Sequence, residues 1–73
     1  MKEFKDILIE KRKEFGLKQL DVAIEIGVSQ SVVSQWELGK NYPTFFSLIG
    51  LADLFKCSLD EMVGRDKGVK YAI

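Results

Sequence analysis

Four polar side chains in the segment 30–35 have the types and spacing needed to read hydrogen-bonding edges. They are Gln30, Ser31, Ser34 and Gln35. Projected on a helix at about 100° per residue, they fall within a sector of about 140° that holds no Lys or Glu. A Gln amide can pair with adenine through two hydrogen bonds in the major groove, and a Ser hydroxyl can serve either base type. The pattern favours a surface that reads base pairs over a plain solvated face.

The opposite side of this predicted helix is apolar. Val32, Val33 and Trp36 fall between about 200° and 300° on the same projection. We therefore interpret Trp36 as a core residue and not as a base-stacking residue. The helix is expected to bury one side and present the other.

A sharp turn precedes this helix. Ile26-Gly27-Val28-Ser29 separates two segments that are too short to be stable as isolated helices. Gly27 can adopt the left-handed conformation that a helix-turn-helix requires, and Ala23 is small enough for the next helix to cross closely. Ser29 is a good N-cap. The segment 19–38 is thus predicted to be a helix-turn-helix.

The remaining pattern predicts an all-α, compact five-helix bundle, because apolar and polar residues nowhere alternate for long. Helices are expected over about 2–14, 19–26, 30–38 and 45–55, and a capping box at 58–61 opens a short fifth helix. Phe4, Ile7, Leu8 and Phe15 are expected on one buried face of the first helix. We divide the chain into a domain at 1–64 and a C-terminal tail at 65–73.

Composition limits the possible functions. The 73 residues suffice for one domain, and they contain one cysteine and no histidine, which excludes an intrachain disulfide and predicts no metal site or cofactor. The formal net charge is zero, which counts weakly against nucleic-acid binding. We expect no signal peptide and no membrane span, and we expect a cytoplasmic protein.

The sequence resembles the lambda-repressor-like (Cro/repressor, XRE-type) helix-turn-helix proteins from about Phe4 to Val63. The resemblance is carried by motifs that occur in the family's order and spacing: Arg12 with Gly16-Leu17-Lys18-Gln19, Val22-Ala23 with Gly27-Val28-Ser29, Val33-Ser34-Gln35-Trp36-Glu37-Leu38-Gly39-Lys40 with Pro43, Leu48 with Leu51-Ala52 and Phe55, and Ser58-Leu59-Asp60-Glu61-Met62. The family fold is a five-helix bundle that binds DNA.

The resemblance implies roles for individual residues. Arg12 and Glu37 match a structural ion pair between the first and third helices. Gln19 matches a glutamine that contacts phosphate, and the loop residues Lys40 and Asn41 match a segment that lies along the sugar-phosphate backbone. Gln30, Ser31 and Gln35 match the base-reading positions of the third helix, and Ser34 matches a neighbour of a phosphate or a base. We also place Ser29 among the DNA-binding residues.

Several residues depart from the family pattern. Lys18 stands where the family prefers Thr or Ser as N-cap, so the second helix is expected to be less well capped. Leu38 is apolar on the groove side and could contact a thymine methyl group or lie at the rim. Further apolar or small residues replace normally polar ones at Leu20, Ile24, Phe46 and Gly50.

The leading hypothesis is a transcriptional regulator, of repressor type, that reads a palindromic operator in double-stranded DNA as a homodimer. Its interface is expected on the fourth and fifth helices and the tail, where Val69, Tyr71 and Ile73 lie, and Gly50 is interpreted as a point of close approach by another backbone. In the rival arrangement, the tail folds back over Leu20 and Ile24.

The alternative functions are a protein-interaction module and an antitoxin-type protein on the same fold, and a restriction-modification controller would share the same residues. An enzyme is a distant third, because the chain lacks a histidine and a phosphate-binding glycine loop, and no small-molecule ligand is implied.

Overall fold

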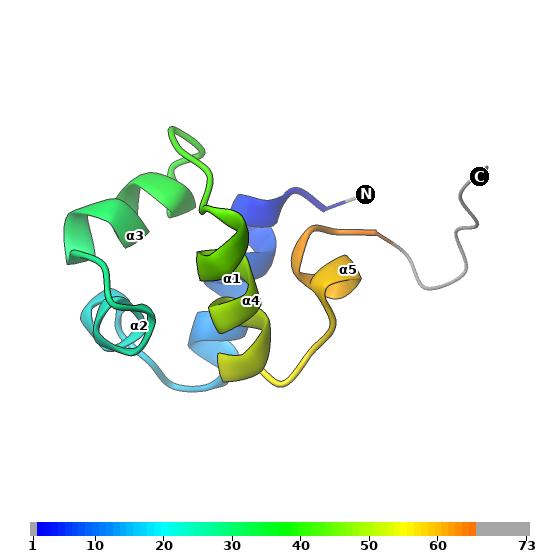
Figure 1. Cartoon of the computed structure of the whole chain (residues 1–73), viewed down its shortest axis with the longest axis horizontal. Helices are drawn as coiled ribbons and strands as arrows, with labels where there is room; N and C mark the ends of the chain where they lie inside the picture. The colour runs from blue at the N-terminus through cyan, green and yellow to red at the C-terminus, as the bar shows by residue number, and fades with distance from the viewer. Residues whose placement is uncertain (1, 66–73) are drawn as a thin grey trace.

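The computed structural model describes residues 2–65 and consists of five α-helices joined by short loops. The helices are α1 (Phe4–Glu14), α2 (Gln19–Ile26), α3 (Gln30–Glu37), α4 (Phe45–Leu54) and α5 (Leu59–Met62). No strand occurs in these residues, so the all-α class is confirmed. In Figure 1, α2 and α3 form one end of the molecule, α5 forms the other, and α1 and α4 lie between them.

Three of the helices begin at a hydroxyl side chain that caps the first turn. The Oγ of Ser29 accepts a hydrogen bond from the Val32 N–H at 3.2 Å, and Ser58 accepts one from the Glu61 N–H at 3.0 Å. Thr44 does the same for α4 through the Ser47 N–H at 3.1 Å. These bonds satisfy amide groups that a helix start leaves without partners, so the starts predicted for these three helices are confirmed.

The other two helix starts differ from these. As expected, the Lys18 side chain does not cap α2, but the Asp21 carboxylate accepts a hydrogen bond from the Lys18 N–H at 2.8 Å. The negative charge of Asp21 also suits the positive end of the helix dipole. The first helix begins at Phe4, two residues after the predicted start, with Glu3 as its N-cap.

Each helix contributes one side chain that is completely removed from solvent. These five residues are Leu8, Val22, Val33, Leu51 and Met62. Burying an aliphatic side chain of this size stabilises a fold by about 1.5–3 kcal/mol relative to leaving it exposed. The core therefore depends on all five helices together.

Two residues have packing partners that the sequence did not predict. Phe15 does not join the buried face of α1, because it follows the end of the helix and is 39% exposed. Its ring packs edge-on against the ring of Phe55, with 5.4 Å between the ring centroids. Gly50 has a close neighbour within its own chain. A Cβ built on Gly50 would lie 3.1 Å from Cδ1 of Ile26, so the glycine lets α2 approach α4 closely.

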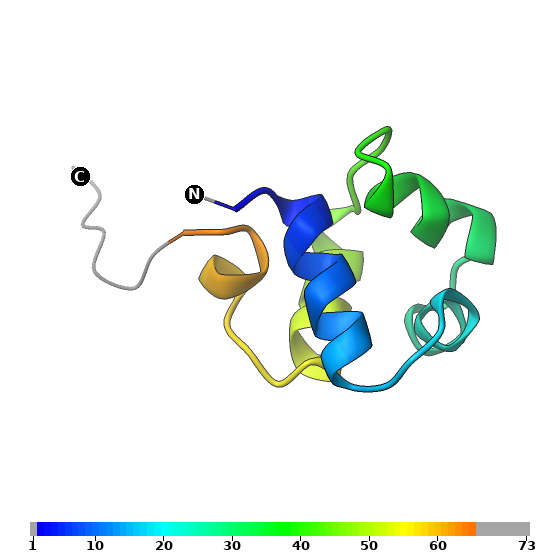
Figure 2. The ribbon, with the colours of Figure 1, turned by 180° about the vertical axis from the view of Figure 1, so that it is seen from behind.

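The first helix connects the two ends of the molecule. It packs against α3 on one side and α5 on the other, which Figure 2 shows from behind. The predicted tail residues Val69, Tyr71 and Ile73 lie outside the described residues. Within residues 2–65, no helix is long and apolar enough to cross a membrane.

Candidate nucleic-acid interface

The connection between α2 and α3 has the geometry of a helix-turn-helix. Gly27 has a φ of +84°, in the left-handed region that favours glycine. The N–H groups of Gly27 and Val28 donate to the Ala23 carbonyl at 2.8 and 3.0 Å, which closes the end of α2. Ala23 is 1% exposed beneath the crossing of the two helices. The turn predicted at these residues is confirmed.

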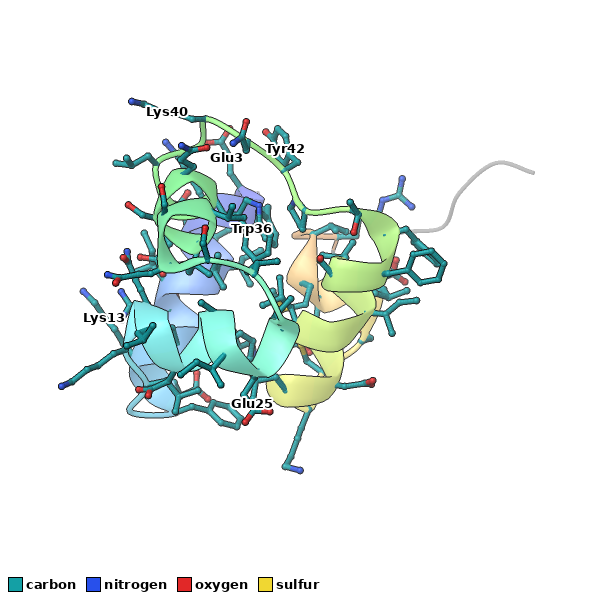
Figure 3. All side chains as sticks on the ribbon, turned by 60° about the vertical axis from the view of Figure 1, so that its left-hand side comes forward. Glu3, Lys13, Glu25, Trp36, Lys40 and Tyr42 are labelled. Atoms are coloured by element: carbon teal, nitrogen blue, oxygen red, sulfur yellow. The ribbon has the colours of Figure 1, made fainter. Side chains whose placement is uncertain are left out.

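The third helix is divided into a buried and an outer side, as its sequence predicts. Val33 and Trp36 are 0% and 3% exposed, and Trp36 points into the interior in Figure 3. On the outer side, Gln30 and Ser31 are exposed, whereas Ser34 and Gln35 are half-buried. Leu38, at the end of the helix, is 61% exposed beside these polar groups. Uncharged donors and acceptors therefore line the outer side, next to one apolar group.

A buried ionic network holds α3 against α1. The Arg12 guanidinium donates from Nε and Nη2 to the two carboxylate oxygens of Glu37 at 2.6 and 3.0 Å, and from Nη1 to the Leu17 carbonyl at 3.0 Å. The Glu37 side chain is only 7% exposed. The hydrogen bonds to Glu37 raise the pKa of Arg12 further above its usual range. This is the ion pair that the family resemblance implies.

Gln19 is a third member of this network, and the sequence did not indicate that contact. Its Nε2 donates to Oε1 of Glu37 at 3.0 Å, so the first residue of α2 is tied to the last residue of α3. The second proton of the amide has no acceptor among the described residues. It remains available for the phosphate contact that the resemblance assigns to Gln19, a role that stays a prediction.

The loop after α3 carries the remaining predicted site residues. Lys40 is exposed and extends outwards from the loop in Figure 3. Asn41 is also exposed, but its Nδ2 donates a hydrogen bond to Oε1 of Gln35. The family resemblance implies a contact of Asn41 with the DNA backbone, and the sequence gives no sign of its contact with Gln35. The six-residue separation of Asn41 and Gln35 gives no helical signal for it, because the chain leaves the helix between them.

The lysines are distributed so that a neutral chain can still present positive charge. Lys2, Lys5 and Lys11 on or before α1 form ion pairs with Glu10, Glu3 and Glu61. Among the lysines in the described part of the chain, those without a carboxylate partner are Lys13, Lys18, Lys40 and Lys56. Lys18 precedes α2 and Lys40 follows α3, so both flank the helix-turn-helix.

Cys57 lies outside this surface. It is a free, half-buried thiol that packs against the core. Burial raises its pKa, which disfavours the thiolate that a nucleophile or metal ligand would need. Its geometry agrees with its interpretation as a small core residue.

Comparison with known proteins identifies the family. Residues 8–62 match the model of a helix-turn-helix family, so the chain belongs to that family. Over 61 residues, which make up 84% of this chain and 54% of the relative, it is 36% identical to the cryptic phage CTXphi transcriptional repressor RstR of Vibrio cholerae. Over 70 residues, 96% of this chain and 34% of the relative, it is 31% identical to the HTH-type transcriptional activator BcrR of Enterococcus faecalis. The chain thus spans about half of these relatives' length or less.

Solved structures give the same assignment. The P22 c2 repressor, crystallised in complex with a synthetic operator, superposes with a TM-score of 0.84 at 26% identity, covering 90% of this chain and 100% of that one. A transcriptional regulator from Listeria innocua gives a TM-score of 0.84 at 33% identity, covering 96% of this chain and 65% of that one. The five-helix architecture expected from the resemblance is confirmed.

Proposed function

We propose that this chain binds double-stranded DNA in a sequence-specific manner and regulates transcription, with α3 in the major groove. The observation that carries the proposal is the outer side of α3, where Gln30, Ser31, Ser34 and Gln35 present hydrogen-bonding groups without a charged residue among them. The repressor and activator relatives and the operator-bound P22 neighbour support it. Such a role agrees with the cytoplasmic location expected from the sequence.

Within this proposal, the DNA contacts fall into two classes. The four outer residues of α3 read base edges, and Ser29 lies beside them at the start of the helix. Gln19 and Lys40 lie at the two edges of the helix-turn-helix and contact the sugar-phosphate backbone, which positions the protein without reading sequence. The unpaired Lys18 adds attraction to phosphate at the α2 side.

Selection of bound sites from a random DNA pool tests the proposal. We expect enrichment of one short motif, and we expect wild-type protein to bind it more tightly than random DNA at a fixed salt concentration. Gln30→Ala should reduce this preference and leave the fold intact by circular dichroism. A pool that shows no enriched motif would contradict sequence-specific binding. It would favour the protein-interaction or antitoxin alternative, which the exposed Leu20 and Ile24 also favour.

We further propose that the chain reads a palindromic operator as a homodimer and represses by occupying it. A single domain of this size reads one half-site, and two-fold pairing at about one helical turn of DNA adds affinity. Phe45 and Phe46, at the start of α4, are 63% and 82% exposed and supply apolar surface for pairing. Gly50 no longer supports this interface, because Ile26 of the same chain explains it.

Sedimentation equilibrium at micromolar concentration tests the dimer. We expect Phe46→Glu to shift the protein towards monomer, whereas Ile24→Glu, at an apolar position on α2 that is 68% exposed, should not. A monomeric wild type would contradict the dimer. A dimer that is weakened only by Ile24→Glu would place the interface on α2.

A further inference from the structure

The loop that follows α3 folds back over the last turn of the helix. Gly39 has a φ of +76°, and its N–H donates to the Trp36 carbonyl at 3.1 Å. The Lys40 N–H donates to the Gln35 carbonyl at 2.9 Å. These two bonds form a Schellman motif, the standard helix ending at a left-handed glycine. The motif brings residue 41 back beside residue 35.

Gln35 is consequently held at two points by the same loop. Its backbone carbonyl accepts from Lys40, and its side-chain Oε1 accepts from Nδ2 of Asn41. Gln30, the other glutamine of the outer side, has no side-chain hydrogen bond to any residue that the structure describes. The Gln35 side chain is therefore oriented before DNA binds, whereas no hydrogen bond fixes the rotamer of Gln30.

The hydrogen bond also decides which end of the Gln35 amide is free. Oε1 is used by Asn41, whereas Nε2 donates to no residue in the described part of the chain. An amide held in this way presents a donor, and the major-groove acceptors are N7 of either purine, O6 of guanine and O4 of thymine. Gln30, which is not held, can still form the bidentate pair with adenine.

We propose that Asn41 is a positioning residue that acts through Gln35, fixing the amide so that Gln35 reads a major-groove acceptor at one base pair. This rests on the proposed function, because it assumes that α3 reads DNA. It differs from the backbone role predicted for Asn41 in an observable way. A phosphate contact contributes to all DNA sequences alike, whereas a positioning contact contributes only where Gln35 reads a base.

The experiment uses the site selected by the wild-type protein and every single-base-pair substitution of it. Gln35→Ala should abolish discrimination at one base pair, a change of at least about fivefold in the affinity ratio. Asn41→Ala should lose most of the discrimination at that same base pair and leave affinity for random DNA unchanged. The double variant should lose no more there than Gln35→Ala alone, because the two side chains act as one unit. Gln30→Ala, the matched control, should affect a different base pair.

Asn41→Asp sharpens the test, because it keeps the shape of the side chain but cannot donate. The carboxylate should accept from Nε2 of Gln35 and turn the amide around, so that Oε1 faces the groove. Preference at the base pair should then move towards a donor, the N6 amino group of adenine or the N4 amino group of cytosine. The added negative charge weakens binding to all DNA, so only the ratio between bases is read.

The outcomes distinguish a failure of the positioning role of Asn41 from a failure of the proposed DNA-binding function. Unchanged discrimination in Asn41→Ala, equal losses on specific and random DNA, or a wild-type preference retained by Asn41→Asp would each overturn the positioning role while DNA reading stands. A wild-type protein that selects no site would overturn the proposed function and this inference together. Circular dichroism of each variant verifies that the fold is retained.

Discussion

The two ends of the molecule are both attached to α1 by an ion pair, but the two attachments differ in kind. At the α3 end, Arg12 binds Glu37 through two hydrogen bonds, and the two side chains are 15% and 7% exposed. At the α5 end, Lys11 binds Glu61 through one contact of 2.5 Å, and these side chains are 19% and 39% exposed. Adjacent residues of one helix thus make a largely buried, bidentate ion pair and a more solvated lysine ion pair.

The difference follows from side-chain chemistry and from what each end has to hold. A guanidinium has several donors in a rigid plane, so Arg12 can satisfy both oxygens of Glu37 and the Leu17 carbonyl as well. The Lys11 ammonium is a compact, well-hydrated charge, so its ion pair can remain partly exposed to water. The rigid attachment lies beneath the surface proposed to meet DNA, where the orientation of α3 matters. The looser one holds a four-residue helix.

The largest expected effect comes from Arg12→Ala. Removing one partner leaves the Glu37 carboxylate buried and without its cation, which typically costs about 3–5 kcal/mol. We expect the free energy of unfolding, measured by urea denaturation, to fall by about this amount. Arg12→Met combined with Glu37→Leu should recover much of the loss, because no buried charge is then left. A single variant as stable as wild type would show that the network is solvated.

A smaller effect is expected on binding from Gln30→Ala and Gln35→Ala. Each should weaken binding to the selected DNA site by about 1–3 kcal/mol, because its hydrogen bonding to a base edge is lost, and each should change binding to random DNA much less. Fluorescence anisotropy at constant salt measures both quantities. Equal losses on both DNAs would remove these side chains from base reading.

Lysines at the two ends of the molecule should differ in their effect on the salt dependence of DNA binding. Lys40→Ala should weaken specific and random binding alike and make the salt dependence shallower by about one ion. Lys2→Ala, which removes a lysine that is paired with Glu10 and lies on the α5 side of the molecule, is the control and should leave the slope unchanged. A salt dependence that changes in the Lys2 variant and not in the Lys40 variant would indicate that DNA binds at the α5 end of the molecule.

The smallest effect is expected from Lys11→Met, because a partly exposed ion pair contributes about 0.2–1 kcal/mol. The hydrogen bond to Glu61 raises the pKa of Lys11 above its ordinary value. Its contribution should therefore be present at neutral pH and be lost as the pH rises through that raised pKa. Urea denaturation of wild type and variant at a series of alkaline pH values measures the difference. Lys13→Met, on the same helix but without an ion pair, is the matched control for the stability difference at neutral pH.

Much of the fold could be predicted because it depends on local signals. Ser29, Thr44 and Ser58 start helices by capping their own first turns, and Gly27 turns the chain by its own conformational freedom. The apolar side of α3 follows from a period of 3.6 residues, which is visible in the sequence without any neighbour. The contacts that could not be predicted are those between residues far apart in the sequence, Phe15 with Phe55 and Gly50 with Ile26.

The candidate site divides in the same way. The sequence by itself determined which side chains α3 turns outwards, since helical spacing alone assigns Gln30, Ser31, Ser34 and Gln35 to one side. Only the tertiary structure decided which of them are held, because the Asn41 contact to Gln35 and the Gln19 contact to Glu37 form between segments that neither helical nor strand periodicity relates. The Asn41 contact depends on the helix ending at Gly39, which turns the loop back over α3. The Gln19 contact depends on how α2 and α3 cross, which the packing of the core fixes.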